Sequence, residues 1–98
     1  MELQGKTAFV TGPAKGMGRA ISMALAREGA NLVLAGRDLT PIEAVAKDAN
    51  VIGAKSIVSR CDVTNPDDVT ASVAEGIAAF GQIDILVNVA GGTGPLGK

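Results

Sequence analysis

A glycine-rich turn near the N-terminus limits the possible fold of this chain more than any other feature. It follows a short, apolar, β-rich stretch at residues 7–11 and precedes residues with helical apolar spacing. Its glycines, Gly12, Gly16 and Gly18, have the spacing Gly-x-x-x-Gly-x-Gly. In such a turn the first glycine permits the sharp bend, the second lets a pyrophosphate approach the backbone, and the third allows close helix packing. The pattern predicts a dinucleotide-binding strand–turn–helix unit, and a plain turn with glycines for packing is the alternative.

The start of the predicted helix strengthens this interpretation. Its free backbone N–H groups and partial positive charge would face the phosphates of a bound cofactor. The spacing is not that of a P-loop, because no Gly-Lys-Ser/Thr closes it. The candidate cofactor contacts in this unit are Gly12, Ala14, Lys15, Gly16, Met17 and Gly18.

Apolar segments and helical patterns alternate through the rest of the chain. Further strands are predicted at residues 31–35, 56–61 and 83–90. Unbroken apolar strands that alternate with helices indicate a parallel sheet covered on both faces. We therefore expect one α/β domain over residues 1–98. It would be the β-α-β-α-β-α-β half of a Rossmann-type, doubly wound parallel sheet with strand order 3-2-1-4.

The helix ends carry recognisable signals. Gly29 and Gly81 are expected to end the first and third helices. Thr40 and Glu43 form a capping box at the start of the second, and Asn65 opens the third. The apolar residues expected to line the buried helix faces are Met17, Ala20, Ile21, Ala24 and Leu25 in the first, Val45, Ala46 and Ala49 in the second, and Val69, Val73, Ile77 and Phe80 in the third.

Composition excludes several kinds of function. The net charge is −1 and no basic block is present, which argues against nucleic acid or a membrane surface as a partner. The chain has no His and no Tyr, so a Ser–His–Asp triad, a histidine metal site and a tyrosine proton donor are impossible within it. Cys61 is the single cysteine, and we interpret it as a small core residue. With no signal-peptide pattern and no apolar run of spanning length, a cytoplasmic protein is expected.

Three short motifs lie at the ends of predicted strands. They are Thr11-Gly12-x-x-x-Gly16-x-Gly18, Asp62-Val63, and Asn88-Val89-Ala90-Gly91. Together they resemble the motifs of the short-chain dehydrogenases/reductases, and the resemblance covers the whole chain. Two departures are Pro13, where the family more often has a small flexible residue, and Val89, which replaces the second Asn of the family's NNAG motif.

The resemblance implies a role for each motif in holding a nicotinamide cofactor. Asp62, with Val63 beside it, would contact the adenine. Asn88 would stabilise the sheet and present its backbone to the ribose, while Ala90 and Gly91 would leave room for the cofactor. A strand-ending turn residue is the alternative interpretation of Asn88.

The end of the second strand bears on the choice between NAD(H) and NADP(H). An NAD site places Asp or Glu there to accept the ribose 2′-OH, but this chain has Gly36 followed by Arg37. Arg37 and Lys15 can hold a 2′-phosphate through charge-assisted hydrogen bonds, as in NADP-preferring family members. Solvated surface charges are the alternative. Asp38 either accepts a 2′-OH or caps the following turn. We expect NADP(H) to be favoured over NAD(H).

By resemblance, the parent enzyme would transfer hydride between NADP(H) and a small carbonyl or alcohol substrate. The family's catalytic Ser, Tyr and Lys would follow the last predicted strand, so no catalytic residue and no metal ligand is expected in these residues.

The last strand would be an apolar sheet edge, which invites self-association. We therefore expect a fragment of a longer enzyme and a homo-oligomer. The alternatives are a non-catalytic nucleotide-binding half-domain that depends on a partner and, less well matched, a flavodoxin-like domain.

Overall fold

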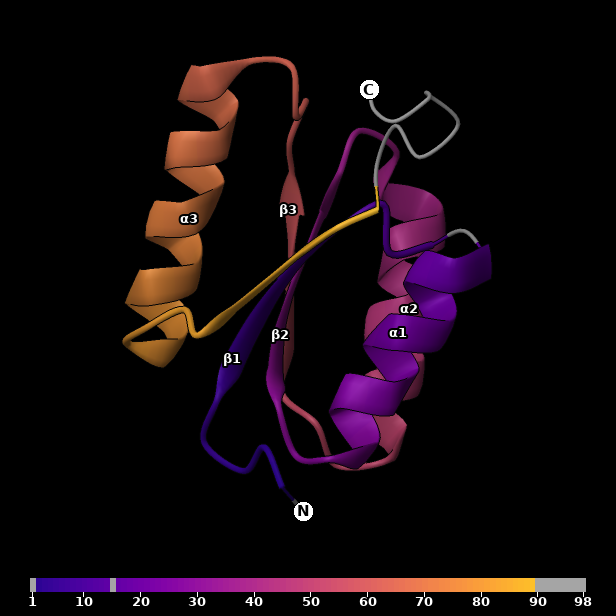
Figure 1. Ribbon diagram of the computed structural model, residues 1–98. Coiled ribbons are helices and arrows are strands. Elements are labelled where there is room, and N and C mark those ends of the chain that lie inside the picture. The colour runs from indigo at the N-terminus through magenta and orange to yellow at the C-terminus, as the bar shows by residue number, and fades with distance from the viewer. Residues whose placement is uncertain (1, 15, 90–98) are drawn as a thin grey trace.

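The computed structural model describes residues 2–14 and 16–89, which form four strands and three helices in strict alternation (Figure 1). The elements are β1 Thr7–Thr11, α1 Gly16–Arg27, β2 Asn31–Gly36, α2 Leu39–Val51, β3 Ser56–Arg60, α3 Pro66–Phe80 and β4 Ile85–Asn88. All strand pairs are parallel, and the order across the sheet is β3-β2-β1-β4. The predicted fold class and strand order are confirmed.

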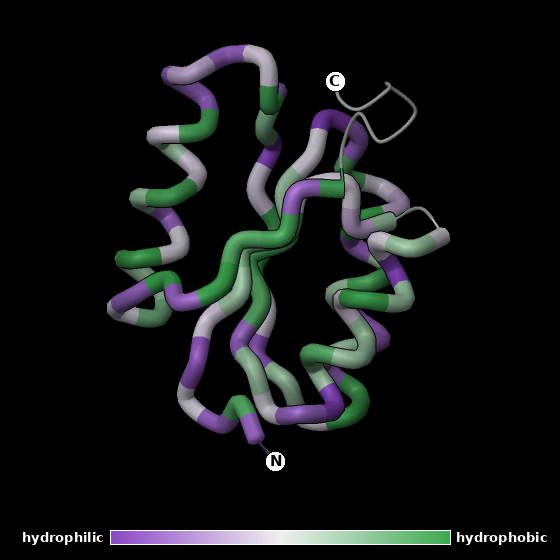
Figure 2. Tube along the Cα trace, viewed as in Figure 1, coloured by the Kyte–Doolittle hydropathy of each residue, from purple (hydrophilic) through white to green (hydrophobic). Residues whose placement is uncertain are grey.

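Helices cover both faces of the sheet. Helices α1 and α2 lie on one face and α3 lies on the other (Figure 1). Side chains alternate along the strands, so Val10 and Leu34 join the core under α1 and α2, whereas Phe9 and Val33 join the core under α3. The central strands accordingly contribute apolar side chains to both cores. Figure 2 shows the matching run of hydrophobic residues along them.

Two helix ends follow the sequence and one differs. The side chain of Asn65 accepts hydrogen bonds from the first turn of α3, and Gly81 ends that helix at φ 88°. At α2 the cap is Asp38, whose carboxylate accepts from the N–H of Thr40 at 3.3 Å. The predicted capping box at Thr40 is wrong because the helix begins two residues earlier, with Asp38 as the cap and Leu39 as the first helical residue.

The packed face of α1 also differs from the prediction. The buried residues are Gly18, Ser22 and Ala26, whereas Met17 is 70% exposed and Ala20 and Ala24 are exposed. The helix lies so close to β1 and its turn that only small side chains fit between them. The larger apolar residues therefore lie on its flanks.

Helix α3 repeats this arrangement with Ser72 and Gly76 as its buried residues. Val69, Val73 and Phe80 pack beside them as predicted, but Ile77 is 47% exposed. The predicted buried position of Ile77 is wrong, because α3 presents Ser72 and Gly76 to the sheet.

Strand β4 forms one edge of the described sheet and is shorter than predicted. It covers Ile85–Asn88 rather than residues 83–90. Ile85 and Val87 pack toward the α1/α2 core, but Leu86 points to the other face and is 71% exposed. Among residues 2–14 and 16–89, no helix is long and apolar enough to cross a membrane.

Candidate cofactor site

The predicted site residues that the structure describes gather at one edge of the sheet. Because all four strands are parallel, their carboxyl ends meet there, and each carries one part of the site. The glycine turn follows β1, Arg37 follows β2, Asp62 follows β3, and Asn88 ends β4. Lys15, Ala90 and Gly91 lie outside the described residues, so their predicted contacts stay predictions.

The three turn glycines have different physical requirements. Gly12 adopts φ 67°, a left-handed conformation, and its N–H donates to the carbonyl of Ala35 at 3.3 Å. A Cβ on Gly18 would overlap the carbonyl oxygen of Gly12 and lie 3.2 Å from Cα of Pro13. Gly16 has φ 24°, and a Cβ placed there would meet nothing within 4 Å. Gly18 is therefore needed for packing, whereas the space over Gly16 is open.

The first turn of α1 carries no carboxylate among its described residues. Helices α2 and α3 begin with side-chain caps from Asp38 and Asn65, and α3 adds Asp67 and Asp68 in its first turn. Helix α1 has no acidic residue in its first turn, which contains Gly16, Met17 and Gly18. Backbone N–H groups at such a helix start carry partial positive charge and suit an anion.

A side-chain hydrogen bond ties the carboxyl ends of β1 and β4 together. The hydroxyl of Thr11 lies 2.9 Å from Oδ1 of Asn88 and 3.4 Å from the carbonyl of Val87, and the shorter distance identifies Asn88 as the better acceptor. Thr11 and Asn88 are also opposite each other in the sheet register. The contact fixes the Asn88 amide beside the glycine turn.

Asp62 is held in a tight turn after β3. Its Oδ1 accepts from the hydroxyl of Thr64 at 2.7 Å and from the N–H of the same residue at 2.9 Å. These two hydrogen bonds hold the pKa of the Asp62 carboxyl below its ordinary value of 3.8, with smaller contributions from the charges of Arg37 and Arg60. The carboxylate is therefore ionised at neutral pH.

Two neighbours of this carboxylate bring positive charge to the carboxyl ends of β2 and β3. The predicted Arg37 is one of them. The other is Arg60, which was not predicted from the sequence and lies opposite Gly36 in the register. The signal that could have identified Arg60 is a cation at the last position of β3, the strand that pairs with β2. This edge of the sheet carries two guanidinium groups around Asp62.

The structure shows Asp38 in one of the two roles considered for it, as the cap of the following helix. Its carboxylate caps α2 through the N–H of Thr40, so it serves the helix start. Gly36 brings no side chain to the end of β2, and Arg37 is exposed. Within the described chain, the end of β2 thus presents the cation Arg37. The next residue, Asp38, has its carboxylate engaged in a helix cap.

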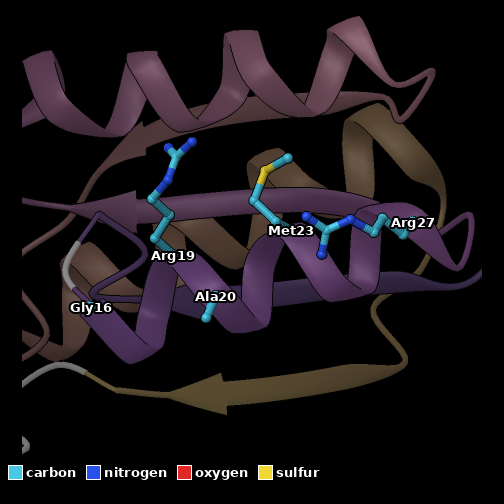
Figure 3. A pocket seen from close by; sticks show the side chains of 5 residues that line it. All are labelled: Gly16, Arg19, Ala20, Met23 and Arg27. Atoms are coloured by element: carbon cyan, nitrogen blue, oxygen red, sulfur yellow. The ribbon is translucent and has the colours of Figure 1, made fainter.

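A shallow pocket of about 350 Å³ lies along α1, away from most of these residues. Figure 3 shows Arg19, Met23 and Arg27 in a row along the helix, and Arg19 pairs with Asp48 of α2 at 2.5 Å. Only Gly16, at the first turn, belongs both to this pocket and to the predicted cofactor site. The pocket is therefore a groove on the flank of α1 rather than the space at the strand ends.

Two predicted contacts are exposed apolar side chains near the site. Met17 in the first turn of α1 is 70% exposed, and Val63 after β3 is 38% exposed. Exposure leaves both accessible to a ligand. Among the residues that the structure describes, no three His, Cys, Asp or Glu side chains lie together as a metal site would require.

The strand order, the parallel register and the glycine turn that connects β1 to α1 are those of one half of a Rossmann-type domain. A family model described as short chain dehydrogenase matches residues 6–97. The chain therefore belongs to the short chain dehydrogenase family.

Relatives of known sequence and structure agree with this assignment. The chain is 42% identical over 90 residues to an uncharacterized oxidoreductase of Staphylococcus haemolyticus, covering 92% of this chain and 38% of that protein. It is 34% identical over 95 residues to 7alpha-hydroxysteroid dehydrogenase of Escherichia coli K12, covering 97% and 37%. A metagenomic short-chain oxidoreductase in complex with NADP superposes with a TM-score of 0.83 at 34% identity, covering 88% of this chain and 39% of that one. The chain spans well under half the length of these relatives.

Proposed function

We propose that this chain forms the cofactor-binding part of an NAD(P)-dependent oxidoreductase that favours NADP(H) over NAD(H). The observation that carries the proposal is the glycine turn at the carboxyl end of β1, next to a β2 end with Arg37 and no acidic side chain at position 36. A structural neighbour that was solved with NADP supports the same cofactor. Residues contacting it would be those named from the sequence, including Lys15, Ala90 and Gly91.

The residues suit a dinucleotide in three ways. The open space over Gly16 leaves its backbone accessible to a pyrophosphate, where a side chain would intervene. The first turn of α1 has no carboxylate to repel the phosphates. The Thr11–Asn88 hydrogen bond holds the end of β4 beside the turn, where a ribose would lie.

The charges at the end of β2 would select the phosphorylated cofactor. Arg37 can make paired hydrogen bonds to a 2′-phosphate, and Lys15 of the turn would add a second cation. Asp38 is engaged at the start of α2, which reduces its availability to a ribose 2′-OH. Arg60 adds positive charge on the neighbouring strand.

The bound cofactor would supply the hydride acceptor or donor, while these residues orient it and neutralise its phosphates. We propose a carbonyl or alcohol as the substrate class, in a cytoplasmic, homo-oligomeric enzyme. The chain contains no Tyr, so a tyrosine acid/base residue is not among its 98 residues. A gene in which no Ser and no Tyr-x-x-x-Lys follow Lys98 would favour the alternative of a non-catalytic nucleotide-binding module.

The test is a titration of the protein with NADPH and NADH, followed by fluorescence. Wild type is expected to bind NADPH more tightly. Arg37→Ala and Lys15→Ala should each weaken NADPH binding by about 10- to 100-fold, the value of a charge-assisted hydrogen bond, and change NADH binding much less. Lys47→Ala, on the exposed side of α2, is the matched control. Equal losses for both nucleotides would contradict the NADP(H) preference.

A further inference from the structure

Gly36, the last residue of β2, has no side chain, and a residue of α2 limits what could replace it. Gly36 does not have positive φ, so its backbone conformation would accept any residue. A Cβ at this position would nevertheless lie 2.6 Å from Cδ1 of Ile42, far inside van der Waals contact. The next nearest atom, Cγ1 of the same side chain, lies at 3.8 Å, an ordinary contact distance. A single methyl group therefore closes position 36.

The Cδ1 methyl is the far end of a flexible side chain, but the surroundings of both residues limit how they can make room. Gly36 is held in the sheet by its pairing with Arg60, and its carbonyl accepts from the N–H of Cys61 at 2.9 Å. Ile42 is only 3% exposed and belongs to the core cluster that contains Leu34 and Val45. Rotating its methyl away would displace packed neighbours, because protein interiors have few voids.

Position 36 is also where an NAD site carries its acidic residue, the last residue of the second strand. We propose that Ile42 is a specificity-determining residue for the cofactor: its Cδ1 methyl keeps position 36 free of a side chain and so excludes the carboxylate that would select NAD(H). This inference rests on the proposed NADP(H) preference. Ile42 acts through position 36 and does not itself touch the cofactor.

The structure offers a change that removes only the blocking atom. Ile42→Val deletes Cδ1, so the nearest remaining atom to a Cβ at position 36 is Cγ1 at 3.8 Å. Gly36→Ala then tests the steric block alone through the thermal unfolding midpoint. We expect Gly36→Ala to lower the midpoint by several degrees in the presence of Ile42, and by at most a degree or two in the Ile42→Val background.

The cofactor is tested with Gly36→Asp in the same two backgrounds, by titration with NADH and NADPH. With Ile42 intact, Gly36→Asp should weaken NADPH binding and improve NADH binding less than about twofold, since the carboxylate is displaced by the methyl. Combined with Ile42→Val, it should improve NADH binding by about tenfold or more, as expected for a hydrogen bond to a charged group. A purely structural role for Ile42 would not change the affinity for NADH relative to that for NADPH. Ile57→Val is the matched control, since Ile57 packs in the core on the other face of the sheet.

The outcomes separate the inference from the proposed function. An equal NADH gain in both backgrounds, or none in either, would overturn the role of Ile42. An equal effect of Gly36→Ala on the unfolding midpoint in both backgrounds would overturn it as well. Wild-type protein that binds NADH as tightly as NADPH would instead overturn the proposed preference, and the unfolding midpoints would still report whether the methyl closes position 36.

Discussion

At the scale of single residues, the distance to neighbouring backbone atoms, rather than the type of residue, decides much of the site. Gly16 and Gly18 are two residues apart, but one faces open space and the other faces the backbone of Gly12. Asp62 and Asp38 are both carboxylates at strand ends, and each is held by a hydrogen bond to a residue two positions further along. The two glycines therefore differ in their backbone surroundings, whereas the two carboxylates make the same kind of local hydrogen bond.

The two glycines should respond differently to alanine. Gly18→Ala forces a side chain into the Gly12 carbonyl, so we expect a loss of about 3 kcal/mol or more in the free energy of unfolding. Gly16→Ala strains only the left-handed backbone, which costs about 1 kcal/mol, and its main effect should be weaker nucleotide binding. Urea denaturation and NADPH titration measure the two quantities. Similar unfolding free energies for both variants would show that the turn packs less closely than described.

The lowered pKa of Asp62 predicts a pH effect. Its folded pKa lies below the ordinary 3.8, so the carboxylate contributes stability above that pH, and the contribution is lost as pH falls through the lowered folded value. Thr64→Val removes the hydroxyl whose hydrogen bond is the largest cause of the lowered pKa. Carboxyl NMR titration should then show the Asp62 pKa rising toward 3.8, and the variant should lose less stability on acidification than wild type. Thr70→Val, on the exposed side of α3, should leave the titration unchanged.

At the scale of elements, both sheet faces depend on helices with small residues at the contact. Helix α3 approaches the sheet through Ser72 and Gly76, and the hydroxyl groups of Ser72 and Ser59 lie 2.6 Å apart in the buried interface. A Cβ on Gly76 would lie 2.8 Å from Cγ2 of Val33 and 3.2 Å from Cδ1 of Ile83. The depth at which the helix lies on the sheet thus depends on one missing side chain.

Replacing that glycine should therefore destabilise the protein despite the higher helix propensity of alanine. Alanine gains about 1 kcal/mol from propensity, but overpacking against the buried Val33 costs about 1–3 kcal/mol. We expect Gly76→Ala to lower the free energy of unfolding by about 1 kcal/mol, measured by urea denaturation. Ala74→Gly, on the exposed side of the same helix, isolates the propensity effect. An increase in stability for Gly76→Ala would refute the close contact.

At the scale of the whole molecule, the sheet is covered unevenly. Helices α1 and α2 pack against one face, while α3 alone lies on the other (Figure 1). Leu86 of β4, next to Phe9 in the register, remains largely exposed on the α3 side. In the described residues, no strand pairs with the outer edge of β4. An apolar free edge of this kind favours association with another strand.

A charge on this edge should reduce association. We expect this 98-residue chain to self-associate at high concentration and Leu86→Lys to shift it toward monomer, because an edge lysine opposes strand pairing. Static light scattering measures the change. Val51→Lys, at the end of α2, replaces another highly exposed apolar residue and should have no such effect. A wild-type chain that remains monomeric at all concentrations would contradict the prediction.

The sequence by itself determined the alternation of strands and helices, the parallel sheet order, and the helix ends at Asn65 and Gly81. The elements and their ends depend on residues close together in the chain, where periodicity and turn chemistry act, whereas the sheet order was expected from the Rossmann topology that the glycine turn indicates. It also indicated which strand ends carry the site, because parallel strands bring their carboxyl ends together. Only the tertiary structure decided which face of α1 is buried, and that Ile42 closes the space beside Gly36. Those outcomes depend on distances between packed elements, which no local pattern encodes.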